Sequence, residues 1–372
     1  DFVLGPDAPK ASRNVLGLIE KVGLEIGGEV LKQRRISQEI QIMVGGRATH
    51  PVWNIPGGVT RALKPEDRDK IRELAKGQLA FAEFSLKLFS DVVLANKEYL
   101  DLIMGDVFEQ VTNYMGLVDE DNKVNFYHGK VRVVDPAGKE IIKYDEPDYL
   151  DHIAEHVEPY SYLKYPYLKE RGWNGFVEGE GTHLYQANPL PRFNAADGMA
   201  TPKAQEHYEK MFETVGGKPC HKLMVNHWAR LIEVLYAAER MIELINDDEI
   251  TDPNVRIIPS TTPSEGVGIV EAPRGTLTHH YWTDENGFVT KANLIVGTTN
   301  NNASISMAIK KVAEKLIKHV GEISDGLLKT VEMAFRLYDP CFSCATHSLP
   351  GQMPLVVEIR DPGGEVIRTV SR

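Results

Sequence analysis

The spacing of apolar residues predicts that helices form most of this protein. Between residues 222 and 246, apolar positions recur at alternating steps of four and three, the spacing of a helix that packs against other helices. A second long helix is predicted from Pro65, because proline suits the first turn of a helix. Its expected apolar stripe consists of Ile71, Leu74, Phe81, Phe84 and Leu88.

Weaker helical patterns cover three further segments, residues 13–44, 303–320 and 324–338. Ser324 can cap the last of these helices with its hydroxyl group. Pro340 is expected to end the same helix, because proline has no backbone amide proton to donate. The helical patterns together predict a core of packed helices.

Short β-hairpins are predicted between the helices. Apolar and polar residues alternate over 124–144, and the Asp-Pro-Ala-Gly sequence at 135–138 interrupts the alternation as a turn would. Two more alternating strands within residues 271–302 flank the Asp-Glu-Asn-Gly sequence at 284–287. Both segments are therefore expected to form antiparallel pairs of strands.

Two segments remain outside these patterns. Residues 157–202 are rich in Tyr, Pro, Gly and Asn without a clear period, which predicts an irregular segment whose aromatic side chains cover a surface. Near the C-terminus, one more strand pattern at 355–359 is followed by a turn sequence at 361–364. The expected fold class is mainly α with small β-hairpins (α+β).

Composition narrows the possible partners and location. Hydrophobic residues make up 42% and charged residues 26%, which is ordinary for a globular protein. The net charge of −11 argues against a nucleic-acid partner, which would need a basic surface. No apolar run reaches the roughly 18 residues of a membrane-spanning helix, so no membrane span is expected. With only three cysteines a disulfide scaffold is excluded, and we expect a reducing compartment.

The candidate chemistry lies in the segment YDPCFSCATHSLPG near the C-terminus. Cys341, Cys344 and His347 form a CxxCxxH pattern, and thiolates select zinc, copper(I), nickel or iron–sulfur chemistry. Spacing alone leaves three interpretations open. The first is a zinc site, for which Cys220 and His221 are the other candidate pair. The second is a redox pair, although the βαβ context of thioredoxin-like proteins is missing. The third is two buried thiols at an inert helix end.

The motif DPCFSCATH resembles the C-terminal metal motif, DPCxxCxxH, of nickel–iron hydrogenase large subunits. Four other segments resemble the same family: LYQANPLPRFNAADGMATPKAQ (184–205), NHWARLIEVLYAAE (226–239), EAPRG (271–275) and LIVGTTNNN (294–302). The similarity covers essentially the whole chain. It is closest to the cytoplasmic methyl-viologen-reducing (coenzyme F420-non-reducing) hydrogenases of methanogenesis, which are coupled to heterodisulfide reductase, and next to NAD-linked bidirectional hydrogenases. The resemblance implies a single large-subunit domain over residues 1–372 with a helical-bundle core.

One motif of that family, RxCGxCxxxH, does not occur in this sequence. In the family, its two cysteines complete a site of four thiolates. The first residues, DFVLGPDAP, resemble the segment that follows this motif, so we expect the sequence to lack its N-terminal part. The alternative is a metal-free, hydrogenase-like structural subunit, such as the relatives in the complex I lineage. Retention of Cys341, Cys344, Arg274 and Asp339 favours the catalytic interpretation over that alternative.

The resemblance implies roles for residues at a nickel–iron centre whose iron carries carbon monoxide and cyanide. Cys341 corresponds to a terminal nickel ligand, which can also take a proton as a base, and Cys344 to the thiolate that bridges nickel and iron. Arg274 corresponds to the arginine that lies over the metals, next to Pro273 in the supporting layer. Asp339 corresponds to the carboxylate that pairs with this arginine. Without the resemblance, Arg274 would be interpreted as one member of a surface ion pair.

Two more residues are implied as supports of the metal centre. Thr298 aligns with a serine or threonine that donates a hydrogen bond to cyanide, although Gly297 stands where the family usually has proline. Asp1 corresponds to a further supporting aspartate. Groups in such positions tune ligand basicity and solvent access. His279 and His280 adjoin the arginine segment, but neighbouring strand residues face opposite ways, and we assign them no role.

The C-terminal region is implied to hold a second metal ion and a processing point. His347 and the backbone carbonyl of Leu294 correspond to ligands of a separate magnesium or iron ion. Cleavage between His347 and Ser348 by a maturation endopeptidase would remove residues 348–372. The alternatives are an exposed His347 without a ligand role and a C-terminal hairpin that is never removed.

The implied reaction is reversible, heterolytic cleavage of molecular hydrogen into protons and electrons. Three cysteines are too few to hold iron–sulfur clusters in this chain, so the electrons must leave through an iron–sulfur small subunit. From there they are expected to reach an electron-transfer subunit, and beyond it a heterodisulfide reductase or a diaphorase module. No organic cofactor is expected on this chain.

Overall fold

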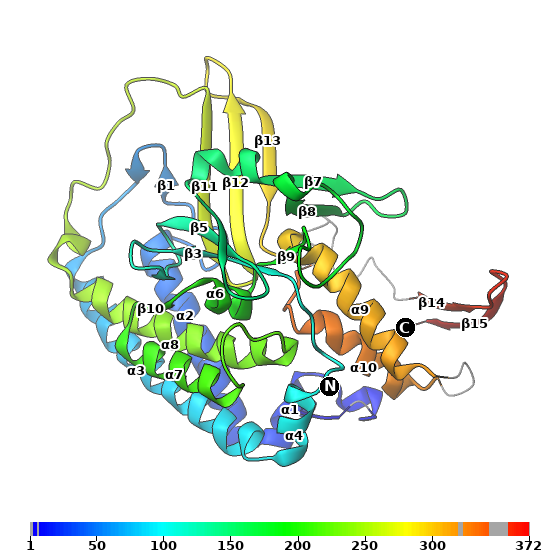
Figure 1. Ribbon diagram of the computed structural model, residues 1–372. Coiled ribbons are helices and arrows are strands. Elements are labelled where there is room, and N and C mark those ends of the chain that lie inside the picture. Colours follow the sequence, from blue (N-terminus) through cyan, green and yellow to red (C-terminus); the bar gives the residue numbers. More distant parts are fainter. Residues whose placement is uncertain (1–2, 6, 319–322, 342–355, 372) are drawn as a thin grey trace.

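The computed structural model describes residues 3–5, 7–318, 323–341 and 356–371. It is 46% helical and 20% strand, with several small sheets, so the predicted α+β class is confirmed. Figure 1 shows the long helices gathered on one side and the sheets above them. Within the described residues, no helix combines the length and apolar character that a membrane span requires.

The two predicted long helices form the centre of the helical layer. They are α3 (Pro65–Phe89) and α8 (Asn226–Asn246), which lie along each other. Helix α2 (Leu24–Gly45) packs on α3, and α7 (Pro202–Thr214) packs on α8 (Figure 1). The apolar stripe predicted for 222–246 is confirmed at positions such as Trp228, which is buried in the main core.

The apolar stripe predicted for the second helix is partly wrong. Phe84 is 41% exposed, whereas Ala75 and Ala82 are fully buried between Ile71 and Leu86. An alanine has no side chain beyond Cβ, so α3 can approach α8 closely along this face, and the bulkier Phe84 lies outside the contact. The helix itself begins at Pro65, as predicted.

Two further helices form the part of the molecule that leads to the C-terminal motif. Helix α9 (Asn302–Leu316) packs against α10 (Asp325–Arg336). Ser324 caps α10 as predicted, because its hydroxyl accepts a hydrogen bond from the Leu327 amide at 3.0 Å. The shorter helical segments are η1 (Lys10–Ser12), α1 (Val15–Val22), the π-helical η2 (Ser90–Leu94), α4 (Lys97–Met104), η3 (Glu146–Asp148), α5 (Tyr149–His152), η4 (Lys169–Arg171), η5 (Leu223–Val225), η6 (Asp248–Thr251) and η7 (Thr299–Asn301).

A small central sheet contains the first predicted hairpin. Strands β5 (Lys130–Val134) and β6 (Glu140–Tyr144) are antiparallel, and their turn falls at 135–138 as predicted. Strand β3 (Asn113–Val118), which pairs with β5, was not predicted. Its residues are buried on both faces, so it has no alternation of apolar and polar positions to detect. Short strands complete the sheet: β4 (Lys123–Val124), β9 (Tyr185–Gln186) and β10 (Gly198–Met199).

The segment expected to be irregular contains ordered elements. Strands β7 (Ile153–Val157) and β8 (Lys164–Leu168) form an antiparallel pair, and α6 (Pro189–Ala195) is a short helix. Every residue of α6 is buried, so the helix has no polar face and no periodic signal. The expected packing of aromatic side chains is present, because Trp173 stacks on His156 with ring centroids 4.0 Å apart.

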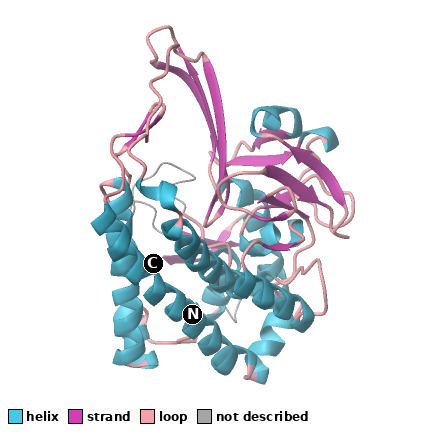
Figure 2. Cartoon of the chain, turned by 90° about the vertical axis from the view of Figure 1, so that its left-hand side faces the viewer, coloured by secondary structure: helices cyan, strands magenta, loops and turns pink. Residues whose placement is uncertain are grey.

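The second predicted hairpin belongs to a three-stranded sheet. Strands β12 (Gly275–Thr283) and β13 (Val289–Ile295) were predicted, and β11 (Glu265–Ala272) pairs with β12 on the other side. Figure 2 shows these long strands extending away from the helices. Ala272 pairs with Gly275, which leaves Pro273 and Arg274 as the loop between β11 and β12. The EAPRG motif therefore forms a tight turn at the end of this sheet nearest the helices.

Two further antiparallel pairs complete the strands of the described chain. Strands β14 (Val356–Arg360) and β15 (Val366–Ser371) are antiparallel, which confirms the strand and turn predicted near the C-terminus. Arg368 of this hairpin donates a hydrogen bond to the Ile323 carbonyl at 3.2 Å. The remaining pair is β1 (Asn54–Ile55) with β2 (Gly58–Val59).

Candidate active site

Two of the residues predicted at the metal centre are in direct contact. Arg274 lies in the turn between β11 and β12, and Asp339 follows α10. The Arg274 Nε donates to the Asp339 carbonyl oxygen at 2.5 Å and lies 3.2 Å from its carboxylate Oδ2. The fold thus joins two motifs that are 65 positions apart in the sequence.

The backbone of Asp339 makes this double contact possible. Its φ angle is +49°, in the left-handed region that aspartate tolerates better than most residues. Both an oxygen of its main chain and an oxygen of its side chain therefore face the same nitrogen of Arg274. The side chains of Arg274 and Asp339 remain 40% and 49% exposed.

The Arg274 guanidinium has hydrogen-bonding capacity that this pairing does not use. Among the residues that the structure describes, its hydrogen bonds come from Nε alone. A guanidinium carries five N–H groups in a planar fork, so the groups on both Nη atoms are available to a ligand. Such a fork suits anionic or strongly polar acceptors.

A second contact brings Thr298 to the first cysteine of the motif. The buried Thr298 hydroxyl accepts a hydrogen bond from the Cys341 amide at 3.1 Å. A hydroxyl that accepts one bond still has its own proton to donate. Thr298 can therefore fix the main chain at Cys341 and serve as a donor to a ligand at the same time.

The two turns that carry Arg274 and Thr298 touch through their main chains. A Cβ added to Gly297 would lie 3.0 Å from the Gly275 nitrogen, and one added to Gly275 would lie 2.5 Å from the Gly297 oxygen. Side chains at these positions would push the turns apart. This contact leaves little room for a side chain at position 297, before Thr298.

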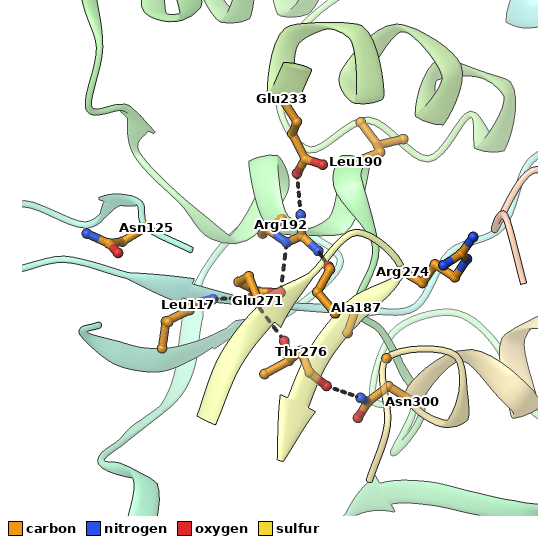
Figure 3. Close-up of polar contacts among 12 residues, drawn as sticks. Leu117, Asn125, Ala187, Leu190, Arg192, Glu233, Glu271, Arg274, Thr276 and Asn300 are labelled. Carbon is orange, nitrogen blue, oxygen red and sulfur yellow. Dashed lines mark hydrogen bonds and ion pairs between the residues drawn. The ribbon is translucent and has the colours of Figure 1, made fainter. Parts of the chain in front are cut away.

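A buried cluster of charges supports the other side of the Arg274 turn. Arg192, on α6, is only 1% exposed and lies between two carboxylates (Figure 3). Its Nη1 donates to Glu233 at 2.5 Å, and its Nε forms an ion pair with Glu271 at 2.9 Å. Its Nη2 donates to the Ala272 carbonyl at 2.6 Å, directly before the turn. Figure 3 shows Arg274 on the same turn, directed away from Arg192.

The carboxylates of this cluster sit in a strongly dehydrated environment. Burial raises the pKa of Glu233 to about 7, although the Arg192 guanidinium acts in the opposite direction. Burial also raises the pKa of Glu271, against opposing contributions from Arg192 and from hydrogen bonds donated by the Leu117 amide and the Thr276 hydroxyl. One guanidinium thus serves two carboxylates, and the less stabilised carboxylate can hold a proton near neutral pH.

Arg230 adds a third arginine near the site. It lies on α8, and its contacts are those of a packing residue. Its guanidinium donates to the Leu337 carbonyl and contacts His227 Nδ1 at 3.1 Å. Burial, together with the Arg230 charge, lowers the pKa of His227 to about 4, so His227 is neutral near pH 7.

Other predicted site residues are reached only in part by the structure. Pro273 occupies the β11–β12 turn beside Arg274, and Leu294 lies half-buried in β13 opposite His279. Cys344, His347, Ser348 and Asp1 lie outside the described residues, and so do residues 348–355 and 372 of the predicted tail, 348–372. Their roles stay predictions.

The structure also bears on the zinc alternative. Within the described chain, no group of three or more His, Cys, Asp and Glu side chains is arranged to hold a metal ion. Burial raises the pKa of the Cys220 thiol to about 11, which disfavours the thiolate form that zinc requires. His221 Nδ1 is engaged by the Tyr114 hydroxyl. The pair 220–221 is therefore poorly suited to complete a zinc site with Cys341.

Sequence reasoning did not single out Arg192 or Asn301, which contact the main chain of the Arg274 turn. Both lie within segments that carry the family resemblance, LYQANPLPRF and LIVGTTNNN. The sequence signal for these two residues was the density of polar residues in these segments. That signal does not reveal which distant main-chain groups each side chain contacts.

Comparison with known proteins gives a consistent result. The model of the nickel-dependent hydrogenase family matches residues 87–347. An F420-non-reducing hydrogenase iron-sulfur subunit of Archaeoglobus profundus is 50% identical over 370 residues, which cover 100% of this chain and 76% of that protein. The NAD-reducing hydrogenase HoxS subunit beta of Cupriavidus necator is 39% identical over 376 residues, covering 99% of this chain and 74% of the relative.

Solved structures agree with these sequence relationships. A chain of an NAD+-reducing [NiFe]-hydrogenase in the H2-reduced state matches with a TM-score of 0.84 at 32% identity, covering 93% of this chain and 74% of that chain. The Ni-Fe-Se hydrogenase from Desulfovibrio vulgaris Hildenborough in the reduced state shares the fold, with a TM-score of 0.61 at 22% identity over 93% of this chain and 76% of that chain. The chain therefore belongs to the nickel-dependent hydrogenase family, as a large subunit.

Proposed function

We propose that Cys341 and Cys344 of this hydrogenase subunit hold the nickel and iron, and that Arg274, Asp339 and Thr298 support them. The observation that carries the proposal is the meeting of Arg274 with Asp339 and of Thr298 with Cys341. These residues come from three separate segments, yet the fold gathers them beside the first cysteine of the DPCxxCxxH motif. The alternative of a metal-free structural subunit offers no reason for this arrangement.

The residues present fit a thiolate-bound metal centre with polar ligands on iron. When bound, the centre supplies Lewis acidity and electron transfer for the heterolytic cleavage of hydrogen, with carbon monoxide and cyanide on its iron. Cys341 provides a soft thiolate ligand and accepts a proton on Sγ. Asp339 orients the Arg274 guanidinium through Nε, which leaves the N–H groups on both Nη atoms to donate to cyanide nitrogens.

Thr298 contributes in two ways to the same site. By accepting the Cys341 amide proton, it holds the main chain that positions the thiolate. Its own hydroxyl proton then serves as a donor to cyanide. Thr298 is buried, so water does not compete efficiently for this donor.

A second ion and a processing step complete the proposal for the C-terminal region. His347 and the carbonyl oxygen of Leu294 bind a magnesium or iron ion apart from the nickel–iron centre. A maturation endopeptidase cleaves between His347 and Ser348. Both steps rest on the match of these residues to the DPCxxCxxH and LIVGTTNNN motifs.

Relatives of this chain are named as subunits of hydrogenases with several subunits, so the chain works with a partner small subunit. We propose that this partner carries iron–sulfur clusters and passes electrons to a heterodisulfide reductase-type acceptor. The 50% identity to an F420-non-reducing hydrogenase subunit supports this acceptor. The HoxS relative and the NAD+-reducing structure favour a diaphorase module as the second candidate, which hydrogen-dependent reduction of NAD+ by the purified complex would identify.

The test of the metal site is the metal content and hydrogen uptake of the purified complex with its partner subunit. The unchanged complex is expected to contain one nickel per large subunit, measured by elemental analysis after removal of loosely bound ions, and iron in excess of nickel, because the clusters of the partner subunit also contain iron. Cys341→Ala is expected to lose nickel and to abolish uptake, because a terminal thiolate is removed. Cys220→Ala is the matched control, since this thiol is buried in the helical core and is expected to leave both unchanged. Full hydrogen uptake by the Cys341→Ala complex would contradict the proposal.

A further inference from the structure

Asn301 joins the segments that carry Arg274 and Thr298. It lies at the end of η7, directly before α9, and its side chain is 0% exposed. The Asn301 Oδ1 accepts a hydrogen bond from the Ala187 amide at 2.8 Å. Its Nδ2 lies 3.0 Å from the Arg274 carbonyl oxygen, 3.2 Å from that of Gly297 and 3.3 Å from that of Ala187. One amide group therefore serves three main-chain segments.

The carbonyl groups that meet at Asn301 require this donor. Buried carbonyl oxygens without a hydrogen bond lose free energy, and several of them at one point repel one another electrostatically. The turns of Gly275 and Gly297 are in direct main-chain contact, so no larger side chain fits between them. The side-chain amide of Asn301 supplies the donor for the Arg274 and Gly297 carbonyls at this contact.

The neighbouring Asn300 has a different task. Its Nδ2 donates to the Thr276 carbonyl at 2.6 Å, inside strand β12 (Figure 3). Its Oδ1 accepts a hydrogen bond from the Tyr185 hydroxyl at 2.7 Å. Asn300 thus attaches the segment to the sheet and to β9. Asn301 instead binds the turn that carries Arg274 and the residue that precedes Thr298.

We infer that Asn301 is a positioning residue of the hydrogenase site. Through the carbonyls of Arg274 and Gly297, it sets the spacing between the Arg274 guanidinium and the Thr298 hydroxyl. This inference rests on the proposed function, in which those two groups donate to the ligands of iron. Asn301 itself acts only through the main chain and touches no reacting atom.

The first test compares Asn301→Asp with Asn194→Asp in the complete complex. The aspartate keeps an oxygen for the Ala187 amide but places a second oxygen against the three carbonyls, so the two turns must separate. Asn194 is the matched control, because it is also 0% exposed and binds both the amide and the carbonyl of Cys220, away from the turns. Both variants are expected to lower the melting temperature.

The readout that separates a positioning role from a structural one is the infrared spectrum of the metal-loaded complex. Asn301→Asp is expected to shift the carbon monoxide and cyanide stretching bands and to lower kcat for hydrogen uptake on the order of 10- to 100-fold. Asn194→Asp is expected to leave the bands and kcat as in the unchanged complex. Unshifted bands in a folded, metal-loaded Asn301→Asp complex would overturn the inference.

A double-mutant cycle covers the case in which Asn301→Asp does not assemble. Asn301→Ala is combined with Arg274→Lys, and kcat is measured for both single variants and the double variant. If Asn301 acts through Arg274, Asn301→Ala lowers kcat much less in the Arg274→Lys background than alone. Equal fold losses in the two backgrounds overturn the inference while the role of Arg274 stands. An Arg274→Lys complex with unchanged kcat overturns the proposed role of Arg274 itself, and the inference with it.

Discussion

One hairpin turn contains Arg274 and is contacted by Arg192, and the surroundings of these two arginines differ sharply. Arg192 is enclosed by Glu233, Glu271 and the Ala272 carbonyl, with 1% of its side chain exposed. Arg274, two residues after Ala272, is 40% exposed and pairs with Asp339 through Nε alone among the described residues. One guanidinium group is therefore buried among protein oxygens, and the other is partly exposed.

The difference separates a structural role, for Arg192, from the ligand-binding role proposed for Arg274. Nη1, Nη2 and Nε of Arg192 each face a protein oxygen in the buried interior, so this arginine holds the turn in place. Arg274 is oriented by one carboxylate and keeps the rest of its fork available. Arg192 holds the turn in place, and Arg274 on that turn keeps N–H groups for a ligand. Preorganised stabilisation of a polar ligand requires donors that are held in position in this way.

The largest expected effect comes from removing the buried arginine. Arg192→Met leaves two buried carboxylates without their cation, and we expect a loss of about 3–5 kcal/mol in the free energy of unfolding. Arg274→Met, in contrast, breaks a partly exposed pair and is expected to cost at most about 1 kcal/mol. Denaturant titration of the two variants measures the contrast. Equal losses in the free energy of unfolding would mean that Arg192 does not stabilise the fold more than Arg274 does.

For hydrogen uptake, the larger effect is expected from Arg274, whose removal costs little stability. Arg274→Lys keeps a positive charge but loses the planar fork, so kcat for hydrogen uptake should fall on the order of 10²- to 10³-fold with little change in stability. Arg240→Lys is a suitable control, because this arginine pairs with the exposed Glu243 on the same helix, α8. The measurement is steady-state uptake together with metal content. Wild-type kcat in an Arg274→Lys complex with its full metal content would contradict the proposed role of Arg274.

A smaller effect is expected in the dependence of stability on pH. Burial raises the pKa of Glu233 to about 7 from an ordinary 4.5, so between these values the folded state binds more protons than the unfolded state. Stability contributed by this group is complete below pH 4.5 and is lost as the pH rises towards 7. The loss amounts to roughly 3 kcal/mol at most, because one pKa unit corresponds to about 1.4 kcal/mol.

The variant that checks this effect is Glu233→Gln, which keeps an acceptor for Arg192 and cannot titrate. Its free energy of unfolding is expected to fall less steeply than that of the unchanged protein between pH 5 and pH 7. The matched variant Glu243→Gln removes a carboxyl group from an exposed ion pair on the same helix and should leave the slope unchanged. Parallel curves for Glu233→Gln and the unchanged protein would show that Glu233 holds no proton in this range.

The exposed Arg274 was predictable from the sequence, whereas Arg192 and Asn301, which hold its turn, were not. EAPRG and DPCFSCATH are motifs with a family resemblance, so Arg274 and Asp339 could be singled out and are found in contact. Arg192 lies on a helix buried on all sides, and Asn301 reaches a residue 114 positions away. Neither position leaves a periodic signal. Helix periods likewise located α8 and α10, but failed on the buried face of α3, where alanines replace large apolar residues.

The contact between Gly275 and Gly297 has a consequence for how the site tolerates change. The separation of the two turns is fixed by atoms that every residue possesses, at distances of 3.0 Å and below for any added Cβ. Apart from changes at Asn301, whose amide binds the carbonyls of both turns, substitutions in the surrounding core can alter packing without altering this separation, since no side chain lies between the turns. The spacing of the two turns is thus expected to tolerate substitutions elsewhere in the protein, as long as both glycines and Asn301 are kept.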